Sequence, residues 1–68
     1  MNDHTFELIE VTGTSSNSIE EAIQNGIARV GKDHNEMRWF AVTEIRGAVQ
    51  NGKASQWQVT LKIGSRLE

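Results

Sequence analysis

Two segments of the chain alternate so that both faces of a strand carry hydrophobic residues. In the first, residues 4–12, Ile9 and Val11 share one face while Phe6 and Leu8 share the other, because successive side chains of a strand point to opposite sides. A strand that is apolar on both faces is normally covered on both faces. Residues 4–12 are therefore predicted to lie in a sheet that is packed on each side.

The second such segment is residues 38–47, which continues through Val49 and is rich in the β-branched and aromatic residues typical of strands. Its two faces are both partly apolar. One carries Trp39, Ala41, Thr43 and Ile45, and the other carries Arg38, Phe40, Val42, Glu44 and Arg46. The chain has only one helix to offer as a cover, so the second apolar face needs another chain or a ligand.

A single helix is predicted after a small polar turn at residues 13–17. Ser18 is a suitable N-cap, and Glu21 follows it at the spacing of a capping box. We expect the helix to end near Gly31. Gly26 costs about 1 kcal/mol relative to alanine inside a helix, and a close approach to the sheet is expected to compensate. The apolar stripe at helical spacing consists of Ile19, Ala22, Ile23, Gly26, Ile27 and Val30.

The Asn51-Gly52 pair predicts a tight hairpin, because both central residues of a type I′ turn need positive φ. It joins the second strand to a last strand over residues 54–66. A two-residue loop pairs Gln50 with Lys53 and fixes the register, whereas a bulge or a longer loop would shift it. The pairs predicted on the helix side are Phe40 with Ile63, Val42 with Leu61, Glu44 with Val59, and Arg46 with Trp57. The pairs predicted on the other side are Ile45 with Gln58, Thr43 with Thr60, Ala41 with Lys62, and Trp39 with Gly64.

Size and composition predict one small domain, residues 1–68, that self-associates. A core of this size gives little stability without a disulfide, a metal or a partner, and the absence of cysteine excludes disulfides and thiolate metal sites. A net charge of −2 with no run of Lys or Arg argues against nucleic acid and membrane partners. We expect a cytoplasmic protein, since residues 1–4 lack a signal-peptide pattern and no apolar run approaches the ~20 residues of a membrane span.

By chemistry alone, few side chains suggest a site. Trp39 would be an interface anchor, Gln58 a solvated strand residue and Trp57 a core residue. Arg46 and Arg66 would equally suit surface ion pairs, for instance with Glu44 or Glu68, or a phosphate clamp. The two histidines have no metal-ligand spacing, and no catalytic triad order, P-loop or dinucleotide motif is present. Neither a catalytic nor a metal site is therefore predicted.

Three segments, in this order of elements, resemble the dodecin family of small flavin-binding proteins. They are residues 11–15 followed by 18–23, residues 39–42 followed by 44–47, and residues 58–62 with Gly64, Arg66, Leu67 and Glu68. The resemblance covers nearly the whole chain. Two departures are Ala41, where the family usually has Glu, and Ser65, where it often has Phe; they concern the pocket wall and the subunit contacts.

The resemblance implies an α+β subunit of β-α-β-β order, with a three-stranded antiparallel sheet wrapped round one helix, assembling into a hollow homododecamer. It implies that riboflavin, FMN or FAD binds at subunit interfaces for storage, buffering or sequestration, without a catalysed reaction. Trp39 would stack on the isoalloxazine ring and Gln58 would hydrogen-bond its polar edge. Arg46 and Arg66 would lie near the phosphate groups.

The predicted register separates two of these residues. Gly64, opposite Trp39, has no side chain and should leave the indole face open, while Gln58 lies opposite Ile45. Six residues of strand span about 20 Å at ~3.4 Å each. If Trp39 and Gln58 contact one flavin ring, we expect them to come from different subunits.

Two other functions fit parts of the sequence. The two-sided apolar sheet would also suit a structural oligomer whose cavity holds ions or other metabolites, with flavin incidental. An enzyme that uses the bound flavin would need an acid or base beside the ring, and Ala41 removes the family's usual Glu from that place. Steady turnover of NAD(P)H with added flavin would identify such an enzyme.

Overall fold

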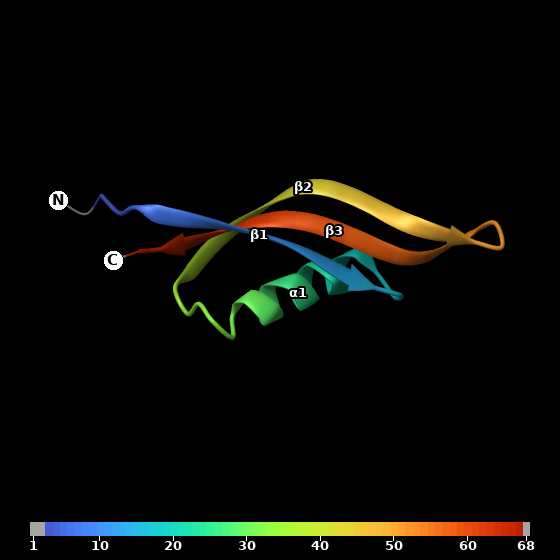
Figure 1. The fold of residues 1–68 in the computed structure, drawn as a ribbon, viewed down its shortest axis with the longest axis horizontal. Helices are drawn as coiled ribbons and strands as arrows, with labels where there is room; N and C mark the ends of the chain where they lie inside the picture. The colour runs from blue at the N-terminus through green and yellow to red at the C-terminus, as the bar shows by residue number, and fades with distance from the viewer. Residues whose placement is uncertain (1–2, 68) are drawn as a thin grey trace.

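One helix and one sheet make up the protein in a computed structural model that describes residues 3–67 (Figure 1). The chain runs β1 (Phe6–Ser15), α1 (Ile19–Val30), β2 (Met37–Gln50) and β3 (Lys53–Arg66). The strands form an antiparallel sheet in the order β1-β3-β2. The α+β class and the β-α-β-β order predicted from the sequence are confirmed.

The strand β1 runs farther than predicted, to Ser15, so the turn before the helix is shorter than residues 13–17. The Ser15 hydroxyl makes this turn by accepting hydrogen bonds from the backbone N–H groups of Asn17 and Ser18 at 2.9 and 3.3 Å. Gly13, inside the strand, lies against the helix: a Cβ there would clash with the carbonyl oxygen of Ala22. The strand and the helix touch at this glycine.

The helix begins at the predicted N-cap, where the Ser18 hydroxyl accepts a hydrogen bond from the Glu21 N–H at 3.0 Å. Only half of the predicted capping box forms, because the Glu21 carboxylate turns to β1 and the turn. It accepts hydrogen bonds from the Ser15 hydroxyl and from Nδ2 of Asn17. These two donors, Ser15 first, hold the pKa of Glu21 below its usual value of 4.5. Gly31 caps the other end.

The hydrophobic core lies between α1 and two of the three strands. Its buried members are Ala22, Val30, Val59, Leu61 and Ile63. Over the described residues, the backbone of α1 lies against β1 and β3, whereas β2 reaches the core through Met37 at its start. Figure 1 shows β2 on the far side of β3 from the helix. A helix about 10 Å across covers about two strands spaced 4.8 Å apart.

The strand β2 is therefore less covered than the sequence predicts. Phe40 and Val42 lie on the helix side of the sheet, as predicted, but 47% and 38% of their surfaces remain exposed. The large hydrophobic side chains exposed within residues 3–67 are Phe6, Leu8, Ile19, Trp39, Phe40, Val42, Ile45, Val49 and Leu67.

The hairpin register is the predicted one at the turn and over residues 39–42. It differs between these two stretches, and it shifts again before Trp39, where Arg38 is extra on β2 and Met37 pairs with Ser65. Gln50 pairs with Lys53 across the turn, where Asn51 and Gly52 have φ of 55° and 75°. The predicted pairs of residues 39–42 are confirmed too. The pairs predicted for residues 43–46 are wrong: Glu44 lies opposite Thr60, Ile45 opposite Val59, and Arg46 opposite Gln58.

Two bulges of opposite sense cause this difference. Between Ala48 and Val49 the extra residue is Ser55 on β3, and between Val42 and Glu44 it is Thr43 on β2. Each extra residue donates its hydroxyl to a carbonyl of the facing strand, Ser55 to Ala48 at 3.3 Å and Thr43 to Thr60 at 3.2 Å. The two shifts cancel, so the pairing returns to the hairpin register at Val42.

The chain is elongated for its length. Its radius of gyration is 14.0 Å and its dimensions are 55 × 20 × 13 Å, whereas a compact domain of 68 residues has a radius of gyration of about 11 Å. The β2–β3 hairpin extends past the helix, with its tip at the end of the molecule away from both termini (Figure 1). Such a shape exposes surface that a single chain cannot bury.

Candidate functional site

All four residues singled out from the sequence lie on one face of the sheet, the face away from α1. Trp39 lies opposite Gly64, and Arg46 lies opposite Gln58, on the same side as Thr60 and Lys62. Arg66 follows Gly64 on this side of β3 and pairs with Phe6. The sequence-based register predicted Arg46 on the helix side; the bulge at Thr43 moves it to the face of Trp39.

The Trp39 indole lies across β3 rather than beside it. A Cβ added to Gly64 would clash with the indole, first with Cε2 and then with its two bonded neighbours, Cζ2 and Nε1. This order of atoms means that a face of the ring rests on the glycine backbone. The prediction that Gly64 leaves the indole face open is therefore true of one face only, and 44% of Trp39 remains exposed.

Phe6 of β1 meets the indole on the far side of β3. The two ring centroids are 6.3 Å apart and the rings are tilted by 59°, which is a favourable aromatic arrangement. Phe6 is itself 38% exposed. The indole thus reaches from β2 over Gly64 to β1.

Arg66 lies near this end of the sheet with an acidic partner. Its guanidinium is 3.7 Å from the Glu36 carboxylate, which also binds Arg38 at 2.7 Å. The Arg66 N–H donates to the Glu36 carbonyl at 2.9 Å, so the same residue holds its backbone. The Nε atom of Arg66 is buried and has no hydrogen-bond partner within residues 3–67. The suggested partner Glu68 lies outside the described residues.

Gln58 and Arg46 form the other end of this face. The Gln58 amide donates from Nε2 to Oε1 of Gln56 at 2.9 Å and is half-buried. Arg46 is exposed, and within the described residues it forms no ion pair with Glu44 or any other acid. Its guanidinium is therefore available to an anion from solution.

The two ends are far apart in one chain. From Gly64, under the Trp39 indole, to Gln58 is six residues along β3, or about 20 Å at ~3.4 Å each. Trp39 with Arg66, and Gln58 with Arg46, are thus two separate groups on one face. One copy of the chain cannot bring both groups to one flavin ring.

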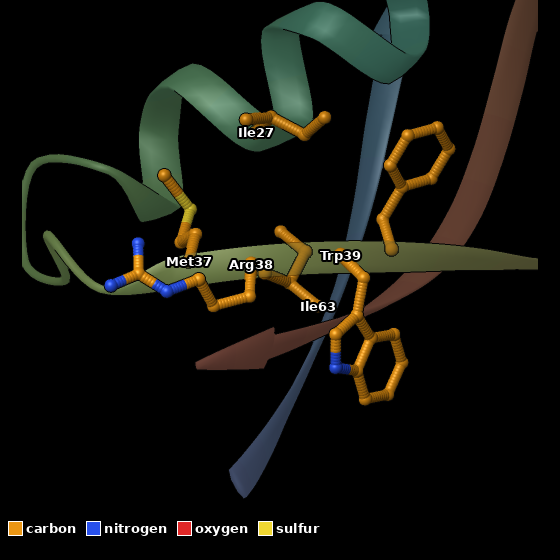
Figure 2. Close-up of a pocket in the computed structure, with 6 residues that line it drawn as sticks. Ile27, Met37, Arg38, Trp39 and Ile63 are labelled. Carbon is orange, nitrogen blue, oxygen red and sulfur yellow. The ribbon is translucent and has the colours of Figure 1, made fainter. Parts of the chain in front are cut away.

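A groove of about 240 Å³ runs along β2 beside Trp39, lined by Ile27, Met37, Arg38, Trp39, Phe40 and Ile63. Figure 2 shows Ile27 of α1 and Trp39 on opposite sides of the β2 ribbon, with Arg38 directed along the strand, away from Trp39. A ligand pocket usually measures about 300–1,000 Å³. Ile27, Phe40 and Ile63 line this small groove from the helix side of the sheet, so most of it lies on the opposite face from Gln58, Arg46 and Arg66.

Trp57, predicted to be a core residue, is half-buried on the helix side of the sheet. It lines a second groove of about 290 Å³, together with Ile19 and Ile45. Ile45 reaches this side because of the Thr43 bulge, having been predicted on the face of Trp39.

Sequence reasoning missed Phe6 and Glu36 as neighbours of the site. Phe6 had no distinctive signal beyond its place on the same strand face as Leu8. Glu36 lies in the connection before β2, where its spacing from Arg38 gave no indication that it would also reach Arg66. No cluster of three potential metal ligands occurs within residues 3–67. Over the same residues, no helix is both long and apolar enough to cross a bilayer.

Comparison with known proteins gives a consistent result. A family model described as Dodecin matches residues 5–68. The dodecin of Thermus thermophilus is 40% identical over 63 residues, which are 93% of this chain and 91% of that protein. The structure of a dodecin from Streptomyces coelicolor matches with a TM-score of 0.92 at 40% identity, over 100% of this chain and 97% of that chain. The structure of the dodecin from Streptomyces davaonensis matches with a TM-score of 0.90 at 39% identity, over 98% of each chain. The chain belongs to the dodecin family.

Proposed function

We propose that this protein binds a flavin, without turning it over, at sites formed between copies of the chain. Riboflavin, FMN and FAD all carry the isoalloxazine ring that Trp39 would stack on. The protein would store or sequester the flavin in the cytoplasm. The observation that carries the proposal is the common face: a half-exposed indole, a glutamine amide and two arginines all lie on the side of the sheet that the helix leaves uncovered.

Each group suits one part of a phosphorylated flavin. The exposed indole face offers a flat apolar surface for the ring, and such stacking adds about 0.5–1.5 kcal/mol beyond area burial. Gln58 offers a donor and an acceptor side by side to the alternating polar edge of the ring. Arg46 and Arg66 supply guanidinium groups, which bind phosphate in a bidentate manner.

The site would be shared between copies. The separation of about 20 Å between the two groups supports a ring that stacks on Trp39 of one copy and meets Gln58 of another. The elongated shape and the exposed hydrophobic residues of β2 support self-association as well. We propose the hollow homododecamer of the family resemblance as the assembly.

Binding without catalysis is a simpler interpretation of this sheet face than an enzyme active site. Ala41, the next residue after Trp39 on this side of β2, can neither donate nor accept a proton. The indole itself would quench the emission of a stacked flavin. A flavin held in this way is shielded from light-driven chemistry, which suits a storage role.

A fluorescence titration tests the proposal. Adding the protein to riboflavin, FMN or FAD should quench flavin emission, and Trp39→Ala should weaken binding about tenfold. Trp57→Phe is the matched control, since it removes the helix-side tryptophan and should bind flavin as the parent does. Undiminished flavin emission with excess protein would refute the proposal.

Native mass spectrometry separates the proposal from the structural-scaffold alternative. Protein purified from its natural source should have the mass of twelve chains plus bound flavin. The mass of an oligomer with ions or other metabolites, and no flavin, would favour the scaffold. A monomeric mass would contradict both hypotheses.

A further inference from the structure

The Trp39 indole is held by two residues that are not among the four proposed flavin contacts. Gly64 of β3 lies under the ring, and Phe6 lies against the ring from β1, the strand on the other flank of β3. We infer that Gly64 and Phe6 are positioning residues that fix the indole parallel to the sheet before a ligand arrives. This inference rests on the proposed flavin function for its purpose, but not for its geometry.

Gly64 acts by having no side chain. The indole atoms Cε2, Cζ2 and Nε1 fill the space that any Cβ at position 64 would need. A larger residue would lift the ring off β3 and tilt it away from the sheet. The strand geometry at Gly64 does not itself require glycine, because its φ lies outside the positive range, so close approach of the ring is the reason for this residue.

Phe6 acts by limiting rotation of the indole. Trp39 is attached to β2 at one edge of the sheet, and its ring crosses β3 to reach Phe6 on β1, the other edge. Such a ring can turn about its side-chain bonds unless something blocks its far end. Phe6 blocks rotation there. It still leaves the outer ring face exposed, because Phe6 lies on β1 opposite Arg66 and not above the indole.

The consequence is a stacking surface with one usable face. The inner face rests on Gly64, so each Trp39 can receive one flat ligand and no more. When an exposed side chain must become ordered on binding, the binding free energy is less favourable by the entropy that the side chain gives up. Fixing the indole beforehand removes that loss, which corresponds to about two- to tenfold in affinity.

Fluorescence anisotropy of Trp39 tests the inference without any flavin. In a Trp57→Phe background Trp39 is the only tryptophan, so its emission decay reports its own motion. Phe6→Ala should lower the residual anisotropy of Trp39, and Phe6→Leu should restore part of it. Val49→Ala is the control, since it trims an exposed apolar residue at the hairpin tip and should leave the anisotropy unchanged.

Flavin titration of the same proteins supplies the second measurement. Phe6→Ala should weaken binding about two- to tenfold, and Gly64→Ala should weaken it further if that variant folds. An unchanged anisotropy in Phe6→Ala would overturn the positioning role, whether or not flavin binds. If the parent bound no flavin but Phe6→Ala still loosened Trp39, the proposed function would fail and the geometry would stand.

Discussion

Arg46 of β2 lies directly opposite Gln58 of β3, on the face of the sheet away from α1. The pair is one residue out of the register that starts at the Asn51-Gly52 turn, because Ser55 is extra on β3. Thr43, extra on β2, ends the shifted stretch. Because of the shifted pairing between Thr43 and Ser55, Arg46 lies on the same face of the sheet as Trp39. Its guanidinium charge is therefore relevant to the proposed site.

Replacing Arg46 by alanine should separate phosphorylated from unphosphorylated flavins. The affinity for FMN should fall about tenfold, because a charge-assisted hydrogen bond contributes about 1.5–3 kcal/mol when well formed and less when exposed, while the affinity for riboflavin should change little. Flavin-emission titrations with both ligands measure this. Arg29→Ala, which removes an exposed helix arginine paired with Asp33 at 3.4 Å, serves as the control. Equal losses for FMN and riboflavin would show that Arg46 does not contact a phosphate.

Two facing glycines should respond to alanine in opposite ways. Gly13→Ala should lower the free energy of unfolding by about 3 kcal/mol, since its Cβ would press on the Ala22 carbonyl and lie 2.8 Å from the Gly26 nitrogen. Gly26→Ala should raise it by up to about 1 kcal/mol, because its Cβ would only make an ordinary contact with Leu61 at 3.4 Å. Urea unfolding at one protein concentration measures both. Destabilisation by Gly26→Ala would mean that the helix cannot accept a methyl group at the sheet.

Glu21 should make folding sensitive to acid. Its folded pKa lies below 4.5 because the Ser15 hydroxyl and then the Asn17 amide donate to the carboxylate, so the unfolded chain binds this proton more readily. The stabilisation is complete above about pH 4.5 and is lost as the pH falls through the lower folded pKa. Glu21→Gln should therefore reduce stability at pH 7 and flatten its decline in acid. The comparison is of unfolding midpoints from pH 7 to pH 3, and parallel curves for the two proteins would contradict this role.

Much of the fold could be predicted from local signals. Ser18, the Asn51-Gly52 turn and the apolar stripe of the helix each act over a few residues, so their effect is visible in the sequence. The positions of the bulges were not visible, because threonine and serine are ordinary strand residues. Only the three-dimensional pairing shows that the hydroxyls of Thr43 and Ser55 bind carbonyls of the facing strand.

The members of the candidate site remain a prediction from the family resemblance, and their arrangement in space could not be predicted from the sequence. The family resemblance supplied Trp39, Gln58, Arg46 and Arg66, but residue types do not reveal which face each occupies after a bulge. Phe6 shapes the site from β1, a strand distant in sequence. Gly64 shapes it by lacking a side chain. Such contributions follow from packing, which a single sequence does not display.

The cancelling bulges set a rule for how this hairpin can change in length. Because side chains alternate with a period of two, a one-residue shift in pairing exchanges the two faces of a strand. Losing Thr43 alone would turn either Trp39 or Arg46 to the helix side, and the two would no longer share a face. Removing one residue from each strand at the tip beyond Val49 and Ala54 would leave every pairing from Ala48 to Trp39 intact. The hairpin can therefore lengthen or shorten at its tip in matched steps, whereas a single insertion or deletion within residues 44–48 or 56–60 would exchange the faces of part of that strand.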